Sequence, residues 1–134
     1  MGLSGTWLQL RHVLTARGRH SIHSPFVFEW YNKVCLGREG NWLQRMEEYF
    51  DTTAKPFSTD QPSKMIVAEI ETFSGEMPEA CEVLILNGIH RSRKNHQKWK
   101  ELQASTTAEV RVTLRNRGLL IRRPGQVRQG FVLR

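Results

Sequence analysis

The chain has few cysteines, no long hydrophobic run and no cluster of metal-binding residues. Its 134 residues include two cysteines, Cys35 and Cys81, too few for a disulfide framework, and no paired Cys or His spacing indicates a zinc site. No apolar run approaches the roughly 20 residues of a membrane-spanning helix. None has the roughly 7–15 apolar residues of a secretory signal either. We therefore expect a cytoplasmic protein with no membrane span and no bound metal.

The chain also lacks the common motifs of nucleotide-binding and hydrolytic enzymes. It contains no G-x-G-x-x-G, no G-x-x-x-x-G-K-[ST], no G-x-S-x-G and no H-E-x-x-H. The ten glycines are scattered along the chain, so none of them belongs to a loop that would cradle a phosphate. The residues alone therefore indicate no catalytic group and no cofactor.

Charge, by contrast, is abundant and unevenly distributed. The net charge is +7, but residues 1–89 carry 8 Lys or Arg against 11 Asp or Glu, whereas residues 90–134 carry 12 against 2. This asymmetry is typical of a protein that binds an anionic partner, most often a nucleic acid. A solvated basic surface produces the same asymmetry. Trp99 and Phe131 are the only Phe, Tyr or Trp residues in the basic half, which disfavours base stacking. The candidate anion-binding residues are Arg91, Arg93, Lys94, Lys98, Arg111 and Arg115.

Residues 1–51 have the periodicity of three helices that form an N-terminal lead-in. Apolar residues at spacings of three and four predict a first helix that ends at Gly18. Ser24-Pro25 provides an N-cap and a proline at the first helical position, which predicts a second helix ending at Gly37. Asn41 and Gln44 have the spacing of a capping box and predict the start of the third.

The remaining residues predict a linker and then a small α/β region. Residues 52–63 are rich in Thr, Ser, Pro and Lys, which is typical of a linker. Residues 64–134 complete one compact domain of mixed α/β class, in which a small mixed sheet with an antiparallel edge follows the helices. Its predicted elements are strands at 65–68, 82–86, 110–114, 119–121 and 131–133, and a basic helix at 92–104 that buries His96, Trp99 and Leu102.

Two polar clusters are candidates for a small-ligand pocket. Asn87, Gly88 and His90 follow a predicted buried strand, and ligands of open α/β sheets bind at the carboxyl ends of strands. A turn that binds nothing explains these residues about as well. His20 and His23 precede a helix start, where anions bind, although a plain capping role also suits them.

Both ends of the chain resemble a family of bacterial class I S-adenosylmethionine-dependent methyltransferases, which have a Rossmann-like fold. The N-terminal match is Gly18-Arg-His-Ser-Ile-His-Ser-Pro-Phe-Val-Phe28, and a similar segment forms a helical lead-in in that family. The C-terminal match begins at Val83-Leu-Ile-Leu-Asn-Gly-Ile-His90 and continues through Gly118-Leu-Leu-Ile121 to Phe131-Val-Leu-Arg134. This part is similar to the family's last third, which is a strand, a helix and a terminal antiparallel hairpin.

The resemblance implies S-adenosylmethionine as cofactor, yet the middle of the chain departs from the family. The family's glycine-rich loop and the acidic residue that holds the cofactor's ribose have no counterpart here. A complete doubly wound sheet would need on the order of 180–200 residues. The family also tends to have paired aspartates where this chain has Asn87-Gly88, and an aromatic residue where it has Arg91.

We therefore expect a shortened, non-catalytic relative that acts as a structural or interaction module, as a homodimer or with a protein partner. Two alternatives stay open. One is a nucleic-acid-binding module that uses residues 91–134. The other is an S-adenosylmethionine-dependent methyltransferase whose site is completed across a dimer.

Overall fold

The computed structural model describes residues 25–57 and 63–133. The predicted first helix and the candidate residues His20 and His23 lie outside the described residues. The chain divides into two compact units, Met1–Ala54 and Lys55–Arg134, so the division falls within the expected linker at 52–63. Among the described residues, no helix has both the length and the apolar character needed to cross a membrane.

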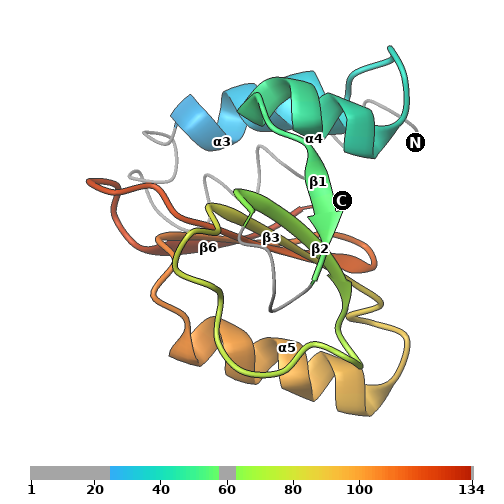
Figure 1. Ribbon diagram of the computed structural model, residues 1–134, viewed down its shortest axis with the longest axis vertical. Coiled ribbons are helices and arrows are strands. Elements are labelled where there is room, and N and C mark those ends of the chain that lie inside the picture. The colour runs from blue at the N-terminus through green and yellow to red at the C-terminus, as the bar shows by residue number, and fades with distance from the viewer. Residues whose placement is uncertain (1–24, 58–62, 134) are drawn as a thin grey trace. The chain divides into compact units, whose positions relative to one another are not determined.

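The first unit contains the two predicted helices that fall among the described residues (Figure 1). Helix α3 (Pro25–Trp30) continues into a wider π-helical turn, η1 (Tyr31–Cys35), and α4 spans Trp42–Phe50. The predicted capping box is confirmed, because Asn41 Oδ1 accepts from Gln44 N at 2.8 Å and Gln44 Oε1 accepts from Asn41 N at 2.9 Å. The helices bury Phe26, Val27, Trp30, Tyr31, Val34 and Met46.

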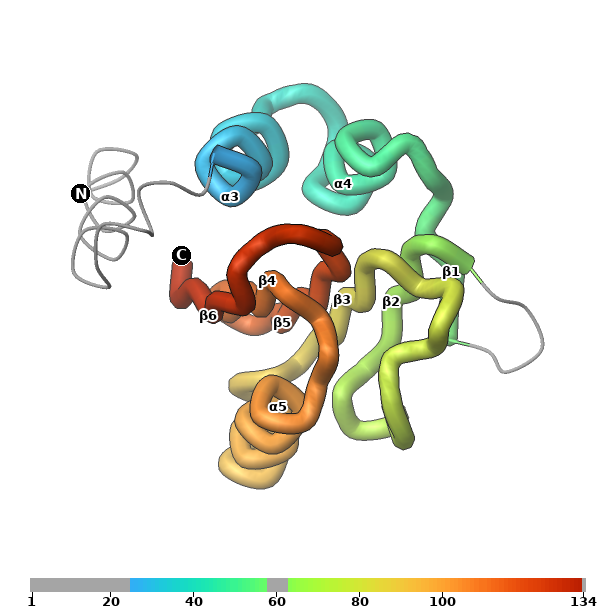
Figure 2. The backbone as a smooth tube through the Cα atoms, turned by 90° about the vertical axis from the view of Figure 1, so that its left-hand side faces the viewer, coloured from blue at the N-terminus to red at the C-terminus, as the bar shows by residue number. Residues whose placement is uncertain are grey.

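The second unit is built on a six-stranded mixed sheet in the order β1-β2-β3-β5-β4-β6 (Figures 1 and 2). Strands β2 and β3 are parallel, β5 runs antiparallel to both β3 and β4, and β6 is parallel to β4. The mixed α/β class is thus as the sequence predicts. The strands are β1 (Ala54–Pro56), β2 (Met65–Glu69), β3 (Val83–Asn87), β4 (Val110–Thr113), β5 (Arg117–Ile121) and β6 (Gln129–Val132).

Two features of the sheet differ from the sequence prediction. Part of the expected linker forms β1, a short edge strand, and an edge tolerates Pro56 because one side of such a strand needs no ladder hydrogen bond. The final strand, β6, pairs in parallel with β4 rather than forming an antiparallel edge with β5. Pro124-Gly125 forms the turn before it, with Gly125 at φ +90° and Gln126 N donating to Arg123 O.

Helix α5 (Arg93–Ser105) packs against one face of this sheet (Figure 2). Trp99 is fully buried and lies over Gly118, where a Cβ atom would come within 2.7 Å of the indole ring. Its Nε1 donates to Thr113 Oγ1 at 2.9 Å. The predicted burial of His96 is wrong, because Asn95 takes the buried position and His96 is exposed.

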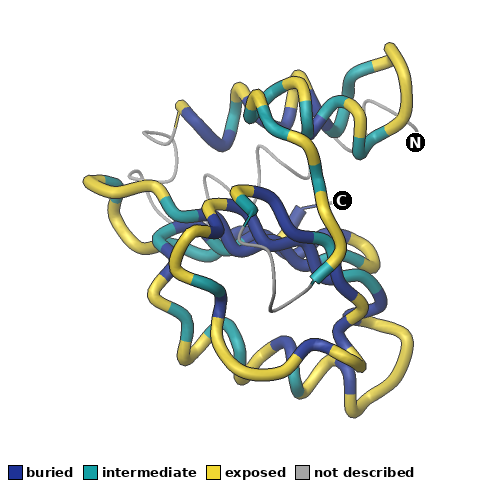
Figure 3. Tube along the Cα trace, in the orientation of Figure 1, coloured by how far each residue is buried: buried dark blue, intermediate teal, exposed yellow. Residues whose placement is uncertain are grey.

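Strand β4 carries little of the exposed positive charge of this region. Thr113 is buried and Arg111 is half-buried, because the face on which they lie is the one that α5 covers. In Figure 3 the strands are largely buried, whereas the outer side of α5 is exposed. The exposed positive charge of this region therefore lies on α5 and on turns rather than on β4.

Candidate functional site

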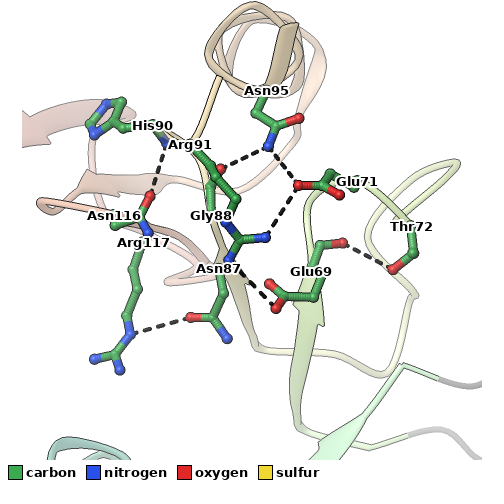
Figure 4. Close-up of polar contacts among 10 residues, drawn as sticks. All are labelled: Glu69, Glu71, Thr72, Asn87, Gly88, His90, Arg91, Asn95, Asn116 and Arg117. Atoms are coloured by element: carbon green, nitrogen blue, oxygen red, sulfur yellow. Dashed lines mark hydrogen bonds and ion pairs between the residues drawn. The ribbon is translucent and has the colours of Figure 1, made fainter. Parts of the chain in front are cut away.

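The carboxyl ends of the parallel strands β2 and β3 carry most of the polar side chains of the candidate pocket (Figure 4). Glu69 ends β2 opposite Asn87, which ends β3. The chain then turns sharply after Glu69, whose carbonyl accepts from Thr72 N and Phe73 N at 3.1 and 3.0 Å. This turn presents Glu71 toward the loop that follows β3. We call Glu69, Glu71, Gly88, Arg91 and Asn95 the strand-end cluster.

Arg91 occupies the centre of the strand-end cluster. Its Nη1 donates to Glu71 Oε1 at 3.2 Å, and its Nη2 lies 3.7 Å from Glu69 Oε1. All three side chains are about half exposed, so solvent screens each pair and its contribution to stability is small. The two carboxylates balance the positive charge of Arg91, and the Arg91 side chain occupies the space at the strand ends.

Asn95 joins the helix α5 to this cluster. Its amide nitrogen donates to Glu71 Oε1 at 3.1 Å and to the carbonyl of Gly88 at 3.0 Å, so both amide hydrogens have acceptors. The hydrogen bond from Asn95, followed by the one from Arg91, lowers the pKa of Glu71 below its ordinary value. Glu71 is therefore held as a carboxylate that binds two donors of the same chain.

The sequence-predicted pocket residues do not converge on one site. Gly88 lies directly under Arg91, where a Cβ atom would come within 3.0–3.2 Å of the guanidinium, and its φ of +83° favours glycine. Asn87 instead accepts from Arg117 Nε at 3.2 Å. His90 points away from the cluster, toward the β4–β5 turn, with its backbone N–H donating to Asn116 Oδ1 at 3.1 Å (Figure 4). Only Gly88 thus belongs to the cluster.

The sequence prediction missed Glu69, Glu71 and Asn95. The two carboxylates lie about twenty residues before Arg91 in the chain. They are therefore not close to Asn87 in the sequence. The signal that would have found them is Glu69-Ile70-Glu71 directly after a predicted buried strand. If that strand is parallel to the next one, the carboxyl ends of both meet at one edge of the sheet.

The candidate anion-binding residues separate into two groups in the structure. Arg91 is held by the two carboxylates, Lys98 Nζ donates to the carbonyl of Phe73 at 2.5 Å, and Arg111 donates to the carbonyl of Gln103 at 3.4 Å. These three side chains have structural contacts within the chain. The other three candidates, Arg93, Lys94 and Arg115, are exposed, as Arg91 is.

Two further arginines of the basic half, Arg122 and Arg128, also serve the fold. Arg122 donates to the backbone carbonyls of Met77, Pro78, Glu79 and Cys81 at 2.6–3.1 Å. Arg128 donates to the carbonyls of Gln103 and Ala104 near the end of α5. Carbonyl oxygens satisfy the hydrogen bonds of a guanidinium without neutralising its charge, so the second unit keeps its positive field.

Metal-binding and cavity features are sparse in the parts of the chain that the structure describes. No three His, Cys, Asp or Glu side chains gather there in a way that would hold a metal ion. A small hollow that opens to solvent lies between the β2–β3 connection and the end of α5. Its walls include Phe73, Met77, Leu102, Thr106, Leu120 and Arg122.

Comparison of the chain with family models, curated proteins and solved structures found no match.

Proposed function

We propose that this chain is a shortened, non-catalytic relative of class I S-adenosylmethionine-dependent methyltransferases that acts as an interaction module. The order of elements in the second unit supports this. Strand β3, helix α5 and the antiparallel pair β4–β5 follow one another, as the resemblance to the last third of that family requires. The mixed sheet with parallel β2 and β3 is also compatible with a remnant of a larger doubly wound sheet.

The observation that carries the proposal is the strand-end cluster. Ligands of open α/β sheets bind in the crevice outside the carboxyl ends of the strands. In this chain that position holds Arg91 between Glu69 and Glu71, with Asn95 closing the network from α5. Arg91 and Asn95 bind the Glu71 carboxylate, and Arg91 also pairs with Glu69, which favours a structural role for the strand ends over a catalytic one.

Calorimetric titration of the full chain with S-adenosylhomocysteine, the product form of the cofactor, tests the proposal. We expect no saturable heat, because the carboxylates at the strand ends, Glu69 and Glu71, are already bound by Arg91 and Asn95. Circular dichroism and a cooperative urea transition on the same sample establish that the protein is folded. Saturable heat at micromolar concentrations would overturn the proposal and favour a methyltransferase.

The titration is best run at a protein concentration whose oligomeric state has been measured by sedimentation velocity. If the cofactor binds only where a dimer is present, the site is completed across the dimer. The variant Arg91→Gln provides a matched comparison, since it opens the strand ends without adding a new charge. Heat with the variant alone would show that Arg91 blocks a retained site.

The proposed module also associates with itself. Among the described residues, two large hydrophobic side chains stay exposed. Val127, which precedes β6, is 69% accessible, and Val132, which lies in β6, is 49% accessible. Val132 lies on β6, which is an edge strand of the described sheet, and a strand edge can pair with a second copy. Sedimentation velocity should therefore detect a dimer in the wild type, and Val132→Lys should shift it toward the monomer. A wild-type monomer at all concentrations would exclude this part of the proposal.

A further inference from the structure

We propose that one flank of α5 and the adjoining β4–β5 turn bind the phosphate backbone of a duplex nucleic acid. The surface consists of five exposed residues and is called the α5 flank: His90, Arg93, His96, Lys100 and Arg115. This goes beyond the interaction module proposed above, because it assigns a partner of stated chemistry to a defined surface.

Helical spacing places three of these residues on one side of α5. Arg93, His96 and Lys100 follow one another at intervals of three and four, so their side chains are neighbours on the helix surface. The buried residues Asn95 and Trp99 lie on the side that faces the sheet. The stripe therefore faces solvent along much of a helix about 20 Å long.

The two remaining residues extend the stripe across the β4–β5 turn. The rings of His90 and His96 lie 5.2 Å apart between centroids. The backbone N–H of His90 donates to Asn116 Oδ1, and its Nδ1 lies at hydrogen-bond distance from the carbonyl of Arg115. These contacts bring the turn, with exposed Arg115, beside the second turn of α5.

The charge of the α5 flank is not balanced by carboxylates of the described chain. The only acidic residue of α5, Glu101, accepts a hydrogen bond from Gln97 at 3.3 Å. Glu69 and Glu71 form ion pairs with Arg91, which lies outside the α5 flank. The helix also has no acidic residue in its first turn, where the helix dipole favours one.

A nucleic acid suits this surface better than an anionic membrane does. Helices that bind membrane surfaces insert an apolar face into the bilayer, whereas the apolar side of α5 is buried against the sheet. Trp99 and Phe131 are buried as well, so they are not accessible for stacking on bases. Over 20 Å a duplex carries roughly a dozen phosphate charges, more than enough to contact this stripe. We therefore infer backbone binding without readout of base sequence.

Fluorescence anisotropy with labelled duplex RNA and duplex DNA of about 16 base pairs tests this inference on the full chain. We expect binding to both, with an affinity that falls steeply between about 50 and 200 mM salt. The triple variant Arg93→Gln, Lys100→Gln, Arg115→Gln should lose about 100-fold in affinity and reduce the salt slope by about 3. A difference between RNA and DNA would identify which duplex is the better partner.

A second triple variant, Arg38→Gln, Lys55→Gln, Lys64→Gln, is the matched control, since it removes the same charge at other exposed positions. It should bind as the wild type does. Equal losses in both triple variants would show a general charge effect and overturn the inference, as would wild-type affinity in the flank variant or no binding by the wild type. Vesicles containing phosphatidylserine form the last arm, and binding to these without binding to either duplex would favour a membrane instead.

Discussion

Arg122 lies beside the connection between β2 and β3 and donates hydrogen bonds to four of its backbone carbonyls. That connection contains no helix among the described residues, although it joins two parallel strands. Its carbonyl groups therefore have few partners in regular secondary structure, and the planar guanidinium with its five donors supplies them. Arg45 serves the first unit similarly, donating to the carbonyls of Val34 and Gly40 at 2.7 Å each.

We expect Arg122→Lys to destabilise the protein by about 1–3 kcal/mol, because an ammonium group cannot reach carbonyls that the guanidinium fork holds together. Urea denaturation followed by circular dichroism measures the change. The neighbouring Arg123 is exposed, and Arg123→Lys should stay within about 0.5 kcal/mol of the wild type. Equal stability of both variants would mean that Arg122 is not needed to order the connection.

Glu71 provides a second prediction for a single residue. Hydrogen bonds from Asn95 and Arg91 lower its pKa in the folded chain, so it stabilises the fold above the pKa of the unfolded carboxyl and loses this contribution as the pH falls through its folded pKa. Asn95→Ala should therefore move the pKa of Glu71 up toward the ordinary value. An NMR titration of the side-chain carboxyl measures this, with Glu48, exposed on α4, as the internal reference. An unchanged titration in the variant would argue against the hydrogen bond.

Elements of this fold begin where their caps are. Helix α4 begins at a capping box between Asn41 and Gln44, and α5 begins at Ser92, whose Oγ accepts from Asn95 N at 3.1 Å. A cap satisfies backbone N–H groups that have no partner inside the helix, so it marks the helix start within one turn. Both starts are visible in the sequence for this reason.

Asn41→Ala should destabilise the protein by about 1 kcal/mol, since it removes the acceptor for Gln44 N. The expected readout is a lower midpoint of urea unfolding with an unchanged slope. Asn41→Asp keeps an acceptor at the N-cap and should restore most of the loss. If Asn41→Asp is as unstable as Asn41→Ala, the side chain has another role.

At the scale of the whole molecule, the second unit has a continuous core between the sheet and α5. Cys81 lies in this core together with Ile66, Leu84, Leu86 and Trp99. Burial raises the pKa of the Cys81 thiol to about 11, which leaves little reactive thiolate near neutral pH. Cys35 belongs to the first unit and is half-buried.

The reaction of Cys81 with a thiol reagent should therefore report opening of this core. In a Cys35→Ser variant at pH 8, we expect labelling by a disulfide reagent to be slow and to accelerate as urea unfolds the chain. A Cys81→Ser variant, which retains Cys35, is the comparison. Fast labelling of Cys81 in native buffer would show that the core opens readily without global unfolding.

The local elements of this protein follow from its amino-acid sequence. The capping box at Asn41, the buried runs of β2 and β3, and the helix after Ser92 follow from residues no more than a few positions apart. Hydrophobic period and capping act over such distances, so they can be recognised without knowing the fold. The mixed α/β class follows from the order of these elements.

Which distant residues contact one another depends on the tertiary fold. The contact of Arg91 with Glu71 spans 20 positions, and those of Arg122 with the β2–β3 connection span more than 40. Such contacts depend on strand order and direction, which the periodicity of a single strand does not encode. Strand order therefore separated the basic residues of the second half into those held by carboxylates and carbonyls and those, such as Arg93 and Lys100, that face solvent.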